Sequence, residues 1–170
     1  YILNDNHILN TWKNWQQKLE SLNFADFTGG VNRGDQRAIF YLIRYFKPKA
    51  VLEIGTHIGA STVNIASAMN INQNEIKKKS IFKTIDIRDV NSTEKKPWLK
   101  YGMTRSPINM IKEFNFSSNV EFVKDISTDY LKNTLDTFDF IFLDGDHSPS
   151  TVYREIPMAL DKLNKGGIIL

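Results

Sequence analysis

The fold is decided by a short apolar run that ends in two glycines, VLEIGTHIGAST at residues 51–62. Ala50–Ile54 is apolar and short enough for a buried strand, and the residues after Gly59 continue as a helix. Gly55 permits a sharp exit from the strand with a positive φ, and Gly59 lets a ligand approach the backbone where the helix begins. A strand, a glycine turn and a helix in this order predict the first unit of an α/β fold.

The same alternation continues along the chain. Further apolar strands are expected at 80–87, 120–123, 138–143 and from 168 onward, with helices near 6–22, before Pro48, and near 105–115, 127–135 and 148–163. Near-continuous apolar strands that alternate with helices predict a doubly wound, Rossmann-like, mostly parallel sheet in three αβα layers. Gly166-Gly167 is interpreted as a turn into the fifth strand, so the strands that would follow it are expected to be absent from the chain.

The 170 residues are 41% hydrophobic and 24% charged, which fits one globular domain of ordinary size. We expect a helical N-terminal extension at 1–29 and a core at 30–170 that is incomplete at its C-terminus.

The absence of cysteine excludes disulfides and a thiol nucleophile, and it fits a cytoplasmic location. No apolar run reaches membrane-spanning length. The net charge of +3 and the Lys77–Lys79 run indicate a solvated turn, so no nucleic acid is expected, whereas a homo-oligomer stays open.

The start of the first crossover helix is suited to an anion, because its backbone N–H groups are unpaired. The G-x-G-x-x-G signal of a dinucleotide site is absent from the glycine turn. The turn instead has the spacing G-x-x-x-G, with Glu53 two residues before Gly55. This pattern suits a ligand that carries both a carboxylate and an ammonium group, with Glu53 on the cationic side and the Ser61 hydroxyl near the helix start.

Two later strands also end in acids. Asp86 closes the strand at 80–87, where a carboxylate can accept two hydrogen bonds from a ribose diol; a helix cap or a loop acid is the alternative. FDFIFLDGDHS at 138–148 is the richest stretch, because Gly145 permits a tight turn beyond a buried strand. We expect Asp144, Asp146 and His147 to converge there and to perturb one another's pKa values.

The glycine turn resembles the first motif of class I S-adenosylmethionine-dependent methyltransferases, in the form E-x-G-x-x-x-G-x-S. FDFIFLDGDHS, with LNKGGII at 163–169, is similar to the branch of small-molecule O-methyltransferases related to catechol-type enzymes. The resemblance runs from about Gly30 to Leu170. It implies S-adenosylmethionine as cofactor, held by Glu53, Gly55, Thr56, Gly59, Ser61, Asp86, Asp125, Ile126 and Asp144. Asp125 and Ile126 would flank the adenine ring, although Asp125 could equally cap the next helix.

The implied reaction is methyl transfer to a small-molecule acceptor, with a hydroxyl group favoured, by in-line displacement. A hydroxyl becomes a good nucleophile when a base removes its proton or a divalent cation lowers its pKa. Asp146 and His147 are the candidate bases. The resemblance also implies Mg²⁺ at Asp144, but one carboxylate does not hold Mg²⁺ well, and the use of a metal stays open.

Two other functions stay open as well. One is an NAD-dependent oxidoreductase, which predicts a dinucleotide turn that the sequence lacks. The other is a catalytically silent scaffold, with Trp12 and Trp15 as its interface, although core packing is the simpler account of both residues. The loop 88–104, which holds Trp98 and Tyr101, is either a lid over the site or a disordered insert.

Overall fold

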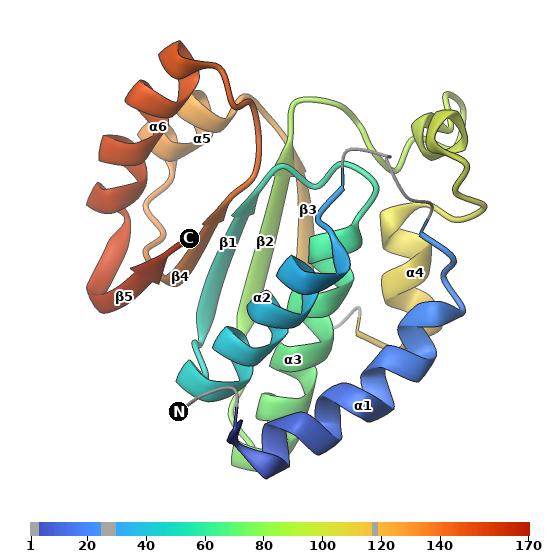
Figure 1. Ribbon diagram of the computed structural model, residues 1–170. Helices are drawn as coiled ribbons and strands as arrows, with labels where there is room; N and C mark the ends of the chain where they lie inside the picture. The colour runs from blue at the N-terminus through green and yellow to red at the C-terminus, as the bar shows by residue number, and fades with distance from the viewer. Residues whose placement is uncertain (1–3, 25–29, 117–118) are drawn as a thin grey trace.

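A computed structural model describes residues 4–24, 30–116 and 119–170 of the chain. These ranges form a five-stranded parallel sheet in the order β3-β2-β1-β4-β5 (Figure 1). The strands are β1 (Ala50–Ile54), β2 (Ile81–Asp86), β3 (Val120–Lys124), β4 (Phe138–Leu143) and β5 (Leu163–Ile169). The predicted parallel sheet is confirmed.

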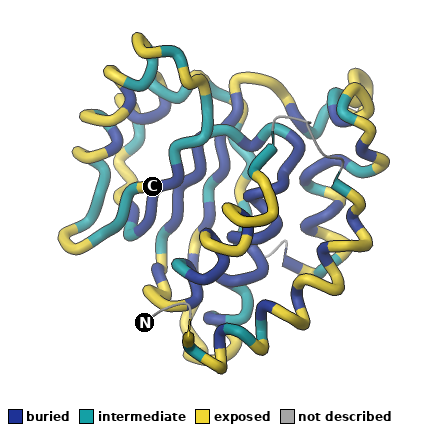
Figure 2. Tube along the Cα trace, viewed as in Figure 1, coloured by how far each residue is buried: buried dark blue, intermediate teal, exposed yellow. Residues whose placement is uncertain are grey.

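Helices cover both faces of the sheet (Figure 1). One face carries α1 (Asn6–Glu20), α2 (Arg33–Phe46), α3 (Ala60–Ile76) and α4 (Pro107–Glu113), and the other carries α5 (Ser127–Asn133) and α6 (Pro149–Asp161). Successive strand residues point to opposite faces, so Val51 and Phe140 join one apolar cluster while Leu52 and Ile141 join the other. Figure 2 shows the buried residues where sheet and helices meet. The three αβα layers are therefore confirmed.

The start of the fifth strand was predicted wrongly. β5 begins at Leu163 rather than Ile168, and the predicted turn at Gly166-Gly167 lies inside it. Its pairing with β4 shifts between Phe138, opposite Leu163, and Phe140, opposite Ile168. Gly166 has a φ of 79°, which allows the irregular stretch to stay in the strand as a bulge.

The N-terminal helix packs onto the same core as the sheet. Trp12 and Trp15 are both buried, which confirms core packing over an exposed interface. The indole N–H of Trp15 donates to Oδ1 of Asn64 on α3 at 2.7 Å. The division of the chain near residue 29 stays a prediction, because residues 25–29 lie outside the described residues.

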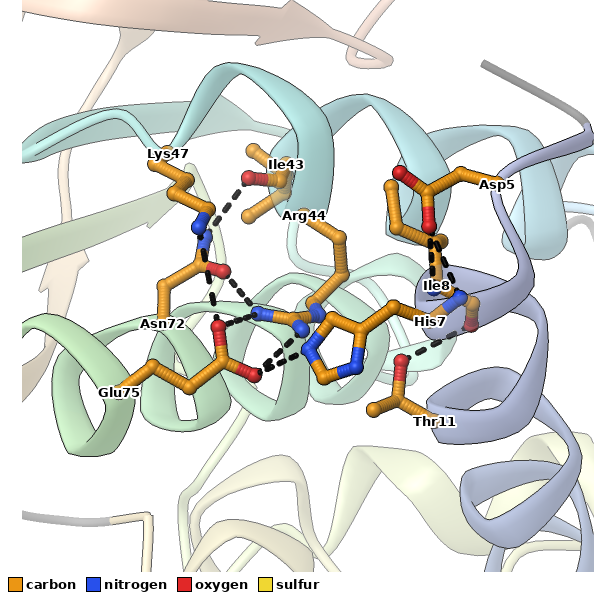
Figure 3. Close-up of polar contacts among 9 residues, drawn as sticks. All are labelled: Asp5, His7, Ile8, Thr11, Ile43, Arg44, Lys47, Asn72 and Glu75. Atoms are coloured by element: carbon orange, nitrogen blue, oxygen red, sulfur yellow. Dashed lines mark hydrogen bonds and ion pairs between the residues drawn. The ribbon is translucent and has the colours of Figure 1, made fainter.

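A polar network ties the first three helices together (Figure 3). Arg44 of α2 is fully buried and donates to both carboxylate oxygens of Glu75 on α3, at 2.7 and 3.1 Å, and to Asn72. Nε2 of His7 on α1 lies 2.8 Å from Glu75 Oε1. The hydrogen bonds from Arg44 lower the pKa of Glu75 to about 2.

The loop after β2 is ordered around one buried tryptophan. It contains the short 3₁₀ helix η2 (Pro97–Tyr101), and Trp98 is buried in the same apolar cluster as residues of α3 and α4. The disordered-insert interpretation of this loop was therefore wrong. Among the described residues, none of the helices is both long and apolar enough to span a bilayer.

Candidate functional site

A cavity of about 500 Å³ opens where β1, β2, β3 and β4 end at their carboxyl edge. Open parallel sheets bind ligands at this edge. Nine of the predicted site residues line the cavity: Gly55, Thr56, Ser61, Asp86, Asp125, Ile126, Asp144, Asp146 and His147. Glu53 and Gly59 do not line it and lie beside the turn that forms one wall.

The two glycines shape the turn between β1 and α3. Gly55 has a φ of 102°, and a Cβ atom there would lie 2.1 Å from the carbonyl oxygen of Asp144, so a side chain does not fit. Gly59, with a φ of 83°, is the N-cap of α3. The helix then begins at Ala60 and Ser61, which face the cavity. The amides of a first helical turn have no helical carbonyl partners, so they are available to an anion.

Glu53 lies beneath this turn and is fully buried. Its Oε2 accepts hydrogen bonds from the hydroxyls of Thr62 and Thr84, at 2.6 and 2.5 Å, while Oε1 has no hydrogen-bond partner among the residues that the structure describes. Thr84 also contacts the hydroxyl of Thr56, at 2.6 Å. Burial raises the pKa of Glu53 to about 7, and the surrounding hydroxyls offset only part of that cost. Glu53 therefore supports the turn from below.

Asp86 ends β2 with its carboxylate surrounded by donors. The backbone amides of His57 and Arg88 each donate to it at 2.9 Å, and the Arg88 guanidinium donates to both oxygens. Burial would raise the pKa of Asp86, but the hydrogen bonds from Arg88 and His57 outweigh it and hold that pKa below its ordinary value. Asp86 is therefore an ionised acceptor at neutral pH.

The wall beyond β3 combines an apolar surface with two acids. Asp125 accepts from the amide of Ile126, at 2.8 Å, whereas α5 has Ile126 as its N-cap and no side-chain cap. The helix-capping alternative for Asp125 was therefore wrong. Ile126 exposes 47% of its surface beside the cavity. The Ser127 hydroxyl donates to Glu155 of α6, a 3% exposed residue that also lines the cavity.

The turn after β4 brings together only part of the predicted cluster. Nε2 of His147 lies 3.4 Å from Oδ1 of Asp144, and the imidazole is 76% exposed. Burial raises the pKa of Asp144, and the nearby His147 partly opposes that rise. Asp146 instead accepts from the amide of Ser148 and from the hydroxyls of Ser148 and Thr151, at 2.8 to 2.9 Å. These hydrogen bonds lower the pKa of Asp146 and hold its carboxylate at the start of α6.

The donor set around Asp144 does not fit a magnesium ion. Over residues 4–24, 30–116 and 119–170, no three His, Cys, Asp or Glu side chains are grouped so as to hold a metal. Mg²⁺ requires near-octahedral oxygen coordination, and Asp146 already accepts three hydrogen bonds from Ser148 and Thr151. The described residues around Asp144 therefore do not supply a set of ligands for Mg²⁺.

Among the ionisable residues that line the cavity, the sequence analysis missed three: His57, Arg88 and Glu155. Arg88 stands two residues after Asp86, so a basic residue close behind a strand-end acid was the available signal. His57 lies inside the glycine turn, with a φ of 48° that non-glycine residues rarely adopt. Glu155 lies within the predicted helix at 148–163, between two of the quoted stretches, and no local pattern marks it.

Together, these features define a class: an α/β domain with a cavity of about 500 Å³ at the switch point of its parallel sheet. The sequence matches the methyltransferase domain family over residues 52–170, and the chain belongs to that family. No curated protein sequence matches the chain.

Solved structures share the fold. The chain resembles a SAH-bound methyltransferase from Podospora anserina at 20% identity, over 96% of this chain and 60% of that one, with a TM-score of 0.63. It resembles an O-methyltransferase from Bacillus cereus in complex with SAH at 21% identity, over 94% and 64%, with a TM-score of 0.62.

A third structure is the O-methyltransferase TomG from Streptomyces achromogenes, involved in tomaymycin synthesis and solved in complex with SAM. It is 18% identical over 97% of this chain and 64% of that one, with a TM-score of 0.62. The chain thus spans less than two thirds of the length of each of these proteins. The class I methyltransferase fold predicted from the glycine turn is confirmed.

Proposed function

We propose that this domain binds S-adenosylmethionine and transfers its methyl group to a hydroxyl of a small-molecule acceptor. The observation that carries the proposal is the shared cavity onto which the glycine turn, Asp86 and His147 all open. Membership of the methyltransferase domain family supports it, as do similar structures with SAM or SAH bound. The same membership favours it over the NAD-dependent alternative.

Each part of the cavity suits one part of the cofactor. The amides at the start of α3, with Gly55, Thr56 and Ser61, suit the carboxylate of the amino-acid tail. Asp86 suits the ribose diol, and Asp125 with Ile126 suits the adenine amino group and ring. The volume of about 500 Å³ lies in the usual range for small-molecule sites, about 300–1,000 Å³. Glu53 and Gly59 would act indirectly, by holding the turn in shape.

The proposed reaction needs a base near the acceptor. When bound, the cofactor supplies an electrophilic methyl group, which the acceptor oxygen takes in line while the carbon–sulfur electron pair stays with sulfur. His147 is the better base, because its imidazole is exposed at the cavity and its Nε2 lies 3.4 Å from the carboxylate of Asp144. It takes the hydroxyl proton, and Asp144 orients the ring and stabilises its positive charge.

Asp146 is the weaker candidate, because its oxygens are engaged by α6 and its pKa is lowered. Magnesium help at Asp144 is not part of the proposed mechanism. The predicted cytoplasmic location rests on the absence of cysteine, and cell fractionation would check it.

Calorimetry with S-adenosylhomocysteine (SAH) and with NAD tests the cofactor. We expect SAH to bind, NAD to fail, and Asp86→Asn to weaken SAH binding at least about tenfold, because two charge-assisted hydrogen bonds are lost. Asp89→Asn, on the exposed loop beyond β2, is the matched control. Binding of NAD in preference to SAH would reject the proposal.

Transfer of a labelled methyl group to a panel of phenolic and sugar hydroxyls tests the chemistry. His147→Ala should lose turnover with SAH affinity retained, whereas Asp146→Asn should keep most of its turnover. Turnover equal to wild type in His147→Ala would contradict the base assignment. SAH binding with no transfer to any acceptor would favour the silent scaffold.

A further inference from the structure

The carboxylate of Asp86 has no acceptor position left for a ligand. A carboxylate offers about four lone-pair sites. Each oxygen accepts one backbone amide, from Arg88 to Oδ1 and from His57 to Oδ2, at 2.9 Å. Each also accepts one guanidinium N–H of Arg88, from Nε to Oδ1 at 3.0 Å and from Nη2 to Oδ2 at 3.1 Å.

The two kinds of donor differ in how easily they leave. The amides belong to the glycine turn and to the end of β2, so their positions follow from the fold. The Arg88 guanidinium sits on a flexible side chain that is 45% exposed, whereas the Asp86 side chain is 6% exposed. A ribose diol that donates two hydrogen bonds to Asp86 must therefore replace the guanidinium and not the amides.

We propose that Arg88 is a placeholder for the ribose diol: it neutralises Asp86 before the cofactor binds, and the cofactor displaces it. The inference rests on the proposed function, because it takes Asp86 as the ribose acceptor. A buried carboxylate without partners is costly, so the pairing stabilises the site until the diol replaces it. The same pairing competes with the cofactor, which makes Arg88 a positioning residue that sets cofactor affinity.

The structure also provides the next partners of the displaced guanidinium. Its Nη2 lies 3.2 Å from Nδ1 of His57, and its Nη1 lies 3.4 Å from the hydroxyl of Tyr101. The Tyr101 ring packs edge-on against His57, with 4.4 Å between ring centroids. Arg88 can therefore leave Asp86 and stay between the glycine turn and η2, so that cofactor binding is coupled to the loop that carries η2.

The test is the affinity of Arg88→Met for SAH, measured by calorimetry. Methionine keeps much of the aliphatic stem and removes every side-chain donor, while the backbone amide of residue 88 remains on Asp86. We expect binding about tenfold tighter than wild type, because two partly exposed charge-assisted bonds no longer have to be broken. SAH has no sulfonium, so loss of the arginine charge does not itself favour the ligand. Arg105→Met, at an arginine of similar exposure that pairs with Glu113, is the matched control and should leave affinity unchanged.

A second measurement separates competition from a general structural effect. Adenosine and 2′,3′-dideoxyadenosine are compared as competitors of SAH on both proteins. Arg88→Met should bind adenosine about tenfold more tightly than wild type does, because the diol no longer has to replace the guanidinium. Its affinity for the dideoxy compound, which has no diol, should be unchanged. Without ligand, Arg88→Met should also unfold at a lower temperature than wild type. Addition of SAH should raise the unfolding temperature of the variant by more than it raises that of wild type.

The outcomes distinguish this inference from the proposal beneath it. Unchanged or weaker SAH binding by Arg88→Met, with weaker binding by Asp86→Asn, would overturn the placeholder alone. An equal gain for adenosine and its dideoxy analogue would overturn it as well. Unchanged binding by Asp86→Asn would remove the ribose assignment and the placeholder together.

Discussion

Glu53→Gln should change how the stability of this domain depends on pH. The pKa of Glu53 is raised from 4.5 to about 7, with burial as the largest cause. At about 1.4 kcal/mol per pH unit, ionised Glu53 costs the folded state about 3 kcal/mol. The folded chain binds this proton more tightly than the unfolded chain. The contribution of Glu53 to stability is therefore most favourable below pH 4.5, falls as pH rises towards 7, and levels off above it.

Glutamine removes the ionisable proton and keeps an oxygen for the Thr62 and Thr84 hydroxyls. Its buried NH₂ group adds a cost that does not vary with pH, so the decisive quantity is the difference between variant and wild type at two pH values. We expect the variant to gain about 2 kcal/mol relative to wild type between pH 5 and pH 8.

Urea unfolding at half-unit steps from pH 5 to pH 8 measures this difference, since every other titrating group is common to both proteins. Glu20→Gln, at an exposed position at the end of α1, is the matched control and should give a constant difference. A constant difference for Glu53→Gln as well would show that its carboxyl titrates in the folded state as it does in the unfolded chain.

Two further substitutions test the packing that holds the site. Gly55→Ala should cost about 3 kcal/mol or more, because its Cβ would lie 2.1 Å from the Asp144 carbonyl oxygen. Gly102→Ala, with a similar positive φ and no atom within 4 Å, should cost only about 1 kcal/mol, and equal losses in thermal unfolding would refute the clash. Trp15→Phe should cost about 1–3 kcal/mol by leaving Oδ1 of buried Asn64 without its indole donor, and a urea midpoint equal to wild type would contradict this.

Much of the site was predictable because its residues stand next to strands. The end of a strand can be predicted from a local apolar run, and the carboxyl ends of parallel strands meet at one edge of the sheet. Gly55, Asp86, Asp125 and Asp144 therefore met at one cavity as expected. The start of β5 was misplaced because glycine pairs signal both turns and bulges, and only the pairing partner distinguishes them.

The sequence by itself determined the layered parallel sheet and the edge of that sheet that carries the site, because periodicity and glycine positions act over a few neighbouring residues. Only the tertiary structure decided how the charged groups share their partners. It turned Asp146 towards α6, left His147 beside Asp144, and placed Arg88 on Asp86. Hydrogen bonds depend on distances of a few tenths of an ångström between side chains, and residue spacing along the chain does not set those distances.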